Sequence, residues 1–262
     1  MVAQIIDAYI ELLMPMGAWV IFWYFLSILI KRNDFVDIAW GLGFIYITLW
    51  LTIKSEPRFL QFVVNGMVAA WGLRLAIYLF YRNLKKNEDY RYKQWREDWG
   101  EWFLLRSFLQ IYILQTFLML IIALPLILVT IIEPLKFSLI SLLGILCWGI
   151  GFYWQTLADY QKSKFKNNID NVGKLMTSGL WSKSRHPNYF GEMLMWWGIF
   201  LSLIPYSYGW IGIISPIVIT YLLLRVSGVP MLEAKQSQHP EFKAYKETVP
   251  AVFPKWINPF HF

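Results

Sequence analysis

Residue types that suit ligand chemistry gather at one point of this chain. A cation, an imidazole and an amide stand together at Arg185, His186 and Asn188, directly before a strongly apolar run, and Tyr189 and Glu192 follow within about one helical turn. An arginine can bind an anionic group, and an asparagine amide both donates and accepts hydrogen bonds. We therefore expect a ligand pocket where the chain enters this apolar run.

The segment 159–188, which leads to these residues, is rich in lysines and small polar residues. It begins at Asp159 and contains Lys162, Lys166 and Lys174. Cationic side chains bind phosphates, so a nucleotide or dinucleotide cofactor fits this chemistry. Positive charge on the cytoplasmic side of a membrane protein explains part of the same pattern.

Several kinds of site are excluded by their missing motifs. No GxGxxG follows a strand pattern, and no Walker A, HExxH or GxSxG motif is present. Cys147 is the single cysteine, so neither a disulfide within the chain nor a CxxC metal site can form. We expect no metal. The Gly-Leu-Gly at 41–43 is expected to pack helices instead of binding a nucleotide.

Two ionisable residues lie inside apolar stretches. Asp37 follows the basic pair Lys31 and Arg32 by about two helical turns, and Arg74 stands about two turns before the cytoplasmic end of its stretch, roughly 8–11 Å in each case. Such residues are costly in lipid and are either paired or functional. One interpretation is a structural ion pair between them, and Glu192 would then only complement a helix dipole. The other is a polar cavity that opens to the cytoplasm.

Composition indicates the elements that position these residues. The chain of 262 residues is 57% hydrophobic, 19% aromatic and only 16% charged, with a mean hydropathy of +0.44. A soluble domain would carry about 25% charged residues. Seven apolar stretches approach the length of a membrane span, and lipid forces each to be helical. They are roughly 8–30, 36–53, 59–81, 108–131, 137–158, 189–205 and 208–225. We predict an all-α polytopic membrane protein with one domain, 1–262.

Lysine and arginine are distributed unevenly between the loops. The loops 31–35, 82–107 and 159–188 and the tail from Arg225 carry 20 of them, and the opposite side carries 3. This asymmetry predicts an N-terminus outside and a C-terminus in the cytoplasm. The net charge of +7 therefore gives no reason to expect a nucleic-acid partner.

A short helix is predicted before the fourth apolar stretch. Tyr92, Trp95, Trp99 and Trp102 recur at steps of three and four, which places them on one helical face. Such a helix lies in the membrane interface. It either anchors the chain or forms a lid over an opening between helices.

Two segments carry a resemblance to a known family. "GKLMTSGLWSKSRHPNYFGE" at 173–192 and "PMLEAKQSQHPEFKAYKETVPAVFP" at 230–254 resemble the C-terminal domain of the steroid 5α-reductase superfamily, which includes sterol reductases. The chain is most similar to an uncharacterised bacterial branch, which also shows "VDIAWGLGF" and "WGLRLAIYL". The resemblance covers most of the chain and is strongest over 155–255. It implies a bacterial inner-membrane protein.

The resemblance implies an enzyme and a cofactor. The expected activity is NADPH-dependent reduction of a C=C bond in a lipid enone, with a 3-oxo-Δ4 steroid as one such substrate. The cofactor cavity would face the cytoplasm, formed mainly by residues 150–262. The resemblance matches Asp159 and Asn188 to family residues that contact NADPH, and it places Lys166 where the family has an arginine. The full set of expected cofactor contacts is Asp159, Lys162, Lys166, Lys174, Arg185, His186, Asn188, Tyr189, Glu192, Arg74 and Arg91. His186 is equally well interpreted as a hydrogen-bonded spacer.

The resemblance also implies residues for the chemical step. In the steroid enzymes a glutamate and a tyrosine 34 residues later hold the substrate carbonyl. Asp37 takes the place of the glutamate here, and the position 34 residues later is Trp71. The tyrosine is thus absent, and Tyr46 is another candidate donor.

A methyltransferase is the alternative. The isoprenylcysteine carboxyl methyltransferases are distantly similar and use S-adenosylmethionine; they share the RHPxYxG element and the tail. Asn188 matches the reductase form of this element, so we favour NADPH as cofactor. A third possibility is a lipid-binding protein without activity. The expected partners are a hydrophobic lipid or steroid and membrane lipids, and we expect a monomer.

Overall fold

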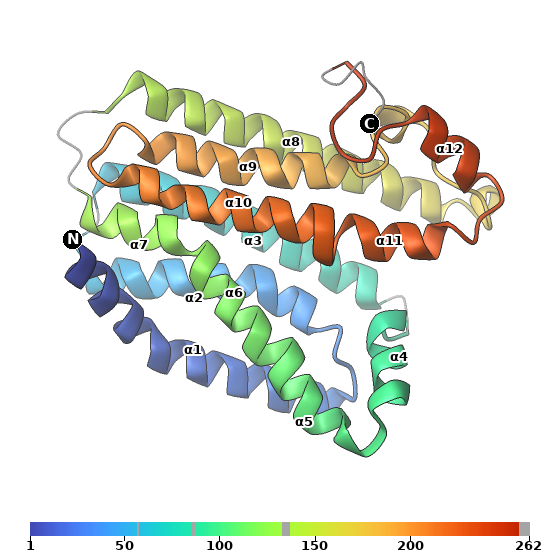
Figure 1. Ribbon diagram of the computed structural model, residues 1–262, viewed down its shortest axis with the longest axis horizontal. Coiled ribbons are helices and arrows are strands. Elements are labelled where there is room, and N and C mark those ends of the chain that lie inside the picture. Colours follow the sequence, from blue (N-terminus) through green and yellow to red (C-terminus); the bar gives the residue numbers. More distant parts are fainter. Residues whose placement is uncertain (57, 85–86, 133–136, 257–262) are drawn as a thin grey trace. The chain divides into compact units, whose positions relative to one another are not determined.

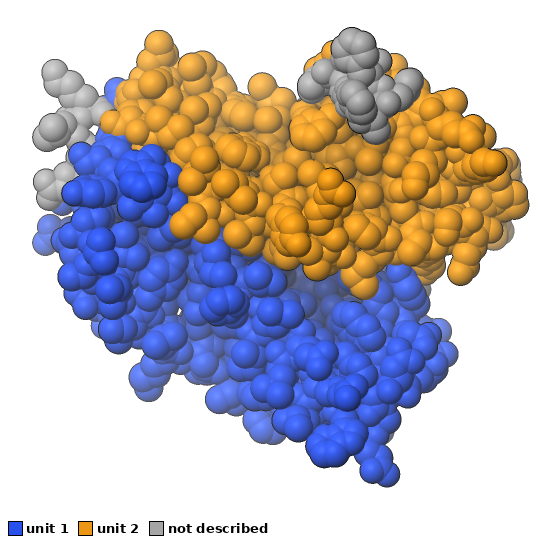
Figure 2. All heavy atoms as spheres, viewed as in Figure 1, with its two compact units in different colours: residues 1–137, 206–212 blue, residues 138–205, 213–262 orange. Residues whose placement is uncertain are grey.

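The computed structural model describes residues 1–56, 58–84, 87–132 and 137–256, and these residues form helices and turns without any strand (Figure 1). The predicted all-α class is confirmed. The chain divides into two compact units (Figure 2). Unit 1 comprises residues 1–137 and 206–212, and unit 2 comprises 138–205 and 213–262. A single domain stays a prediction, and each unit is described by itself.

Within the described residues, six helical segments are long and apolar enough to cross a membrane. They are Val2–Ile30, Val36–Lys54, Phe59–Leu84, Tyr90–Ile131, Leu139–Asn167 and Gly209–Gln236. The predicted polytopic membrane protein is confirmed. The six do not include the predicted stretch 189–205, which folds as the 17-residue helix α9 (Pro187–Leu203). Orientation stays a prediction, and three lysines of the count, Lys85 and Lys86 on the richer side and Lys136 on the opposite side, lie outside the described residues.

Unit 1 contains the first four spans. The first three are single helices, α1 (Val2–Ile30), α2 (Val36–Lys54) and α3 (Phe59–Leu84). The fourth is divided into α4 (Tyr90–Trp99), η1 (Gly100–Trp102), α5 (Phe103–Ser107), the π-helix η2 (Phe108–Ile113), α6 (Leu114–Ile122) and α7 (Leu124–Ile131). Its regular hydrogen bonding breaks at Ala123 because Pro125 has no N–H and its ring crowds the preceding turn.

Small residues bring α2 and α3 together. A Cβ placed on Gly41 would lie 2.6 Å from the carbonyl oxygen of Gly72, and one on Gly72 would lie 2.5 Å from that of Gly41. Real Cβ atoms do not approach a carbonyl so closely, so the two backbones meet only because neither residue has a side chain. The prediction that Gly-Leu-Gly packs helices is confirmed at Gly41.

Unit 2 contains the long helix α8 (Leu139–Asn167), which runs beside α9 (Figure 1). Short 3-10 turns η3 (Ile169–Asn171) and η4 (Gly179–Ser182) connect them. After η5 (Gly209–Ile213), which begins in unit 1, the chain continues as α10 (Ile214–Tyr221), the π-helix η6 (Leu222–Val226), α11 (Val229–Gln236) and α12 (Phe242–Thr248).

The contact between α8 and α9 is built from two glycine pairs. A Cβ on Gly151 would lie 2.7 Å from the Gly191 carbonyl oxygen, and one on Gly144 would lie 2.6 Å from that of Gly198. The glycines are spaced by seven residues on both helices, which keeps them on one face over two turns. The close approach places the polar residues of α8 and α9 next to one another.

Candidate functional site

The start of α9 is fixed by the C-terminal segment of unit 2. His186 is the N-cap of α9 and Pro187 is in its first turn, where its missing N–H costs nothing. The backbone N–H of Arg185 donates to the Pro250 carbonyl at 2.9 Å, and that of His186 donates to the Ala251 carbonyl at 2.9 Å. This short ladder orders the residues that sequence analysis singled out.

Glu233 on α11 is the centre of a buried ionic cluster. Arg185 donates from Nε to Oε1 of Glu233 at 2.8 Å, and its NH2 lies 2.7 Å from the same oxygen. The guanidinium also donates to the carbonyls of Lys246, at 3.2 Å, and Val249. Only 7% of the Arg185 side chain is exposed. Arg185, expected from the sequence as a cofactor contact, is therefore held by a carboxylate and backbone carbonyls.

His186 is buried beside the same carboxylate. Its Nε2 lies 3.4 Å from Glu233 Oε1, and its ring stacks on Tyr189 at 5.2 Å. Burial lowers the pKa of His186 below its ordinary value, although the hydrogen bond to Glu233 opposes this shift. The imidazole is thus neutral near pH 7. This geometry fits the spacer interpretation of His186.

A second polar set lies where α8 and α9 meet. Gln155 on α8 donates from Nε2 to Oε2 of Glu192 on α9, and both side chains are buried. Asp159, one turn after Gln155, is 5% exposed. Asn188 is one turn before Glu192 on α9. The structure therefore gathers Asp159 with Gln155 on one helix, and Asn188 with Glu192 on the other.

Two oxygens of this set accept no hydrogen bond from the described residues. Among the described residues, no hydrogen-bond partner reaches Oδ1 of Asn188 or Oε1 of Gln155, and both atoms are buried. A buried acceptor without a donor is costly, so each favours a ligand that donates. Gln155 was not predicted from the sequence. Its position one helical turn before Asp159 is the signal that could have identified it.

The lysines of unit 2 lie at its surface. Lys162 is half-buried and places its ammonium 4.0 Å from the centre of the Trp181 ring. The Trp181 indole in turn donates to the Ala158 carbonyl at 3.1 Å. Lys166 and Lys174 are exposed. Their predicted contacts with a phosphate stay a prediction.

The candidate catalytic residues belong to unit 1. Asp37 near the start of α2 accepts from Arg91 NH2 at 3.0 Å and from the Tyr92 hydroxyl at 2.8 Å. Arg91 also donates from Nε to Asp89 at 3.0 Å. The structure brings Arg91, expected from the sequence as a cofactor contact, to this carboxylate, and the ion pair of Asp37 with Arg74 stays a prediction. Tyr92 is 2% exposed, and the sequence predicted it only as one residue of an aromatic helix face.

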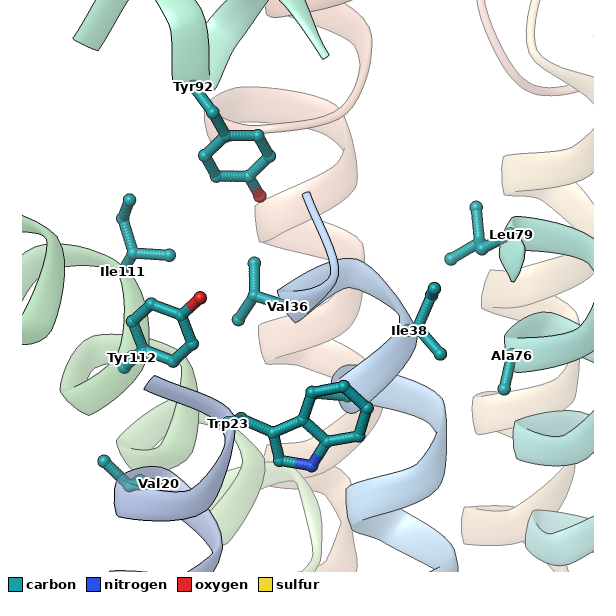
Figure 3. Packing of buried hydrophobic residues seen from close by; sticks show 10 residues of the cluster. Val20, Trp23, Val36, Ile38, Ala76, Leu79, Tyr92, Ile111 and Tyr112 are labelled. Atoms are coloured by element: carbon teal, nitrogen blue, oxygen red, sulfur yellow. The ribbon is translucent and has the colours of Figure 1, made fainter. Parts of the chain in front are cut away.

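Helix α4 is secured at its first turn. Asp89 caps it by accepting a hydrogen bond from the Arg91 backbone N–H at 3.1 Å. Burial raises the pKa of Asp89, but the hydrogen bonds and charge of Arg91 outweigh burial, so the pKa is lowered. Glu88 accepts from the Asn33 backbone N–H at 2.7 Å. Figure 3 shows Tyr92 pointing from α4 toward the apolar cluster around Val36. The predicted helix is therefore present and attached to α2.

The other two predicted catalytic residues lie elsewhere in unit 1. Trp71 on α3 is 2% exposed and its ring meets Phe44 edge-on at 5.4 Å. Tyr46 stacks on Trp19 at 5.1 Å. Tyr46 follows Asp37 by nine residues, about two and a half turns, so the two residues lie on opposite sides of α2. Arg74, one turn after Trp71 on α3, is half-buried. The catalytic roles of these residues stay predictions.

Comparison with known proteins gives one family and one curated relative. Residues 23–249 match the family described as "Protein of unknown function (DUF1295)". The chain is also 35% identical over 95 residues to Delta(14)-sterol reductase erg24 of Schizosaccharomyces pombe. That match covers 29% of this chain and 22% of the relative, so the chain corresponds to about a fifth of the relative's length. No solved structure matches. Because the family match extends over most of the sequence, the chain belongs to the DUF1295 family.

Proposed function

We propose that this protein is an NADPH-dependent membrane oxidoreductase that reduces a C=C bond of a lipid enone. The observation that carries the proposal is the buried polar set on α8 and α9, in which Asn188 Oδ1 has no hydrogen-bond partner among the described residues. A nicotinamide carboxamide has an NH2 group that would satisfy this acceptor. Similarity to a protein named as a sterol reductase supports the same reaction class.

The residues of unit 2 fit such a cofactor. Asn188 and Gln155 offer acceptors, and Lys162, Lys166 and Lys174 offer cations for phosphates. Arg185 is engaged with Glu233, so we assign phosphate binding to the lysines and give Arg185 the task of holding the start of α9. His186 and Tyr189 stack on each other at the start of α9.

When bound, NADPH supplies a hydride to the carbon β to the substrate carbonyl. Negative charge then develops on the carbonyl oxygen, and a donor aimed at that oxygen lowers the barrier. A proton taken from water by the carbon α to the carbonyl would complete the reduction. Asp37 accepts hydrogen bonds from Arg91 NH2 and from the Tyr92 hydroxyl. We therefore propose that Asp37 orients Arg91, whose guanidinium has further N–H groups besides those bound to Asp37 and Asp89 and can donate to the substrate carbonyl. Trp71 and Tyr46 remain further candidates for the donor.

The remaining parts of the proposal concern the substrate and the setting. A 3-oxo-Δ4 steroid or a prenyl enone is the substrate that we would test first. We further propose a monomer in a bacterial inner membrane, as the family resemblance implies for the membrane, with its N-terminus outside, an orientation that the distribution of lysine and arginine supports. No observation favours the methyltransferase alternative, because the curated relative is named as a reductase.

Cofactor binding by the purified protein in detergent tests the proposal. NADPH should raise Tm and S-adenosylmethionine should not, because only a ligand of the native state stabilises it. Asn188→Ala should weaken NADPH binding by roughly 5–150-fold, the loss expected for one buried polar contact. Gln238→Ala, which removes an exposed amide of unit 2, is the matched control and should bind as the parent does. Unchanged NADPH affinity in Asn188→Ala would remove the observation that carries the proposal.

A further inference from the structure

Two arginines lie close together at one end of unit 1. Helix α1 is followed by Lys31, whose left-handed backbone (φ 57°) turns the chain so that the Arg32 N–H donates to the Ser27 carbonyl at 3.0 Å. Arg82 lies in the last turn of α3. Both arginines therefore stand where a membrane-spanning helix ends, at the level of the lipid headgroups. Sequence analysis predicts that this end faces the cytoplasm.

Asn83 joins the two arginines. Its carbonyl oxygen accepts from Arg32 NH2 at 3.2 Å, and its Oδ1 accepts from Arg82 Nε at 3.2 Å. Its Nδ2 in turn donates to the Asp34 carbonyl at 3.4 Å, and Asn83 is buried. One buried residue thus holds both guanidinium groups beside the turn between α1 and α2.

The charges of the two arginines are compensated differently. Arg32 donates from Nε and NH2 to the two carboxylate oxygens of Asp34, at 3.0 and 2.7 Å, so this pair is neutral. Arg82 is half-buried and forms no ion pair with a carboxylate in the described part of the chain. Its charge acts on Asp89, but that carboxylate is bound by Arg91. One positive charge therefore remains at this end of α3.

Both arginines keep N–H groups that the protein does not use. Within the described residues, NH1 of Arg32 and the two terminal nitrogens of Arg82 form no hydrogen bond. A planar guanidinium matches two oxygens of a phosphate, and an anion bound there would compensate the charge of Arg82. The chemistry therefore favours a phosphate group.

Apolar side chains flank the arginines on both helices. They are Leu29 and Ile30 on α1, and Phe80, Tyr81 and Leu84 on α3, and all of them are exposed. In a bilayer such side chains contact acyl chains, while the arginines lie at the boundary with water. A free phosphate would use the guanidinium groups alone, whereas a phospholipid would use both the cationic and the apolar surface.

We propose that Arg32 and Arg82 bind the phosphate of an anionic phospholipid, whose acyl chains pack on the exposed apolar side chains of α1 and α3. An anionic lipid is favoured over a zwitterionic one, because Arg82 and the exposed Lys31 contribute positive charge that the protein leaves uncompensated. The site lies within unit 1 and involves neither the cofactor nor Asp37, so it does not depend on the proposed reduction.

The test uses lipids with the same acyl chains and different headgroups. The purified full-length protein in neutral detergent is titrated with dioleoyl-phosphatidylglycerol, dioleoyl-phosphatidylcholine and dioleoylglycerol, and native mass spectrometry counts the bound lipid. One phosphatidylglycerol should bind more tightly than either of the other lipids. Glycerol 3-phosphate, which has the phosphate without acyl chains, should not displace it at equal concentration.

Arg82 is the residue to change, because Arg32 also neutralises the buried Asp34. Arg82→Gln should weaken phosphatidylglycerol binding by about 5–15-fold, the loss of one charged contact with a phosphate. Arg82→Lys keeps the charge without the planar group and should lie between this variant and the parent. The matched control is Arg106→Gln, which removes an exposed arginine of α5 and should bind the lipid as the parent does.

Equal affinity of the parent for phosphatidylglycerol and phosphatidylcholine would overturn the proposal. Equal weakening by Arg82→Gln and Arg106→Gln would also overturn it, because net charge alone would then explain the binding. Displacement of the lipid by glycerol 3-phosphate would assign the arginines to a soluble phosphate instead. A protein that selects phosphatidylglycerol but fails to bind NADPH would contradict the proposed reductase and leave this lipid site in place.

Discussion

Unit 1 and unit 2 each contain a carboxylate held by an arginine and a ring, and the two arrangements differ in what would remain after one partner is lost. Asp37 and Arg91 are 20% and 22% exposed, and Arg91 keeps Asp89 as a second carboxylate. Glu233 and Arg185 are 11% and 7% exposed. Arg185 has neutral backbone carbonyls as its other acceptors. If Asp37 is lost, Arg91 still has the Asp89 carboxylate, whereas Arg185 would have no carboxylate after the loss of Glu233.

This difference suggests separate tasks for the two clusters. Glu233 binds Arg185 and lies beside His186, the residues that precede α9, so it fixes the polar end of the α8–α9 pair. Asp37 orients a phenol and a guanidinium at the start of α2, and its geometry can be altered at lower cost. The first cluster serves stability, and the second can serve chemistry.

The largest effect is expected from breaking the unit 2 cluster. Glu233→Ala leaves the buried Arg185 without its carboxylate and should lower the free energy of unfolding by about 3–5 kcal/mol. Lys246→Ala removes the other cation on Glu233, at 3.4 Å, but that side chain is 58% exposed and the loss should stay below about 1 kcal/mol. Unfolding by denaturant in micelles measures both. Equal losses of unfolding free energy in Glu233→Ala and Lys246→Ala would contradict the greater contribution that we assign to the buried ion pair.

A second comparison sets the helix contacts of the two units side by side. Gly151→Ala and Gly41→Ala would each place a Cβ within 2.7 Å of a facing backbone oxygen. The backbones must move apart, at a cost of about 1–3 kcal/mol each. Gly149→Ala and Gly66→Ala meet nothing within 4 Å and should be neutral or slightly stabilising. The Tm of all four variants measures this difference. Equal changes in Tm for the contact glycines (Gly151, Gly41) and the open glycines (Gly149, Gly66) would contradict this packing.

The unit 1 cluster should tolerate changes better. Asp37→Asn leaves Arg91 paired with Asp89, and Tyr92→Phe removes one hydrogen bond, so each should cost about 1–2 kcal/mol and leave NADPH affinity nearly intact. If Asp37 orients the donor for the substrate carbonyl, Asp37→Asn should also lower kcat by roughly 10²–10³-fold. An unfolded Asp37→Asn protein would show that this carboxylate is as essential to stability as Glu233.

The smallest effect concerns pH. The folded-state pKa of His186 is lowered by burial, so the unfolded chain takes up a proton first as the pH falls below about 6.5. Stability should therefore be full above that pH and decline below it, by at most about 1.4 kcal/mol per pH unit. His186→Gln should flatten this decline in Tm. A rise in Tm on acidification would contradict a buried neutral imidazole.

The sequence was informative where lipid restricts the choices. Apolar runs had to be helical because unpaired backbone groups are costly in hydrocarbon, and the spans follow these runs. The Pro125 break and the Gly41 contact follow from single residues with known backbone effects. The length of α9 was less certain, because a run of 17 residues is at the lower limit for a span.

The partners of the site residues could not be obtained from spacing. Arg91 reaches Asp37 across 54 residues, and Glu233 reaches Arg185 across 48. Such pairs depend on which helices pack together, and periodicity within one helix contains no record of this. The contact of Tyr92 with Asp37 was missed for the same reason, because it joins two different helices. Gln155 was overlooked although its place one turn before Asp159 on α8 could have indicated it.

Transfer of hydrogen from the cofactor to a lipid tests the central claim most directly. Purified protein is incubated with NADPH that carries deuterium at C4, in separate reactions for the two faces of the ring, together with a lipid extract containing added prenyl enones and 3-oxo-Δ4 steroids. Mass spectrometry should find a reduced lipid with one deuterium, from one labelled face only, and Asn188→Ala should lose this product at limiting cofactor. The account would be contradicted if no lipid gained deuterium and NADPH left the Tm of the parent protein unchanged.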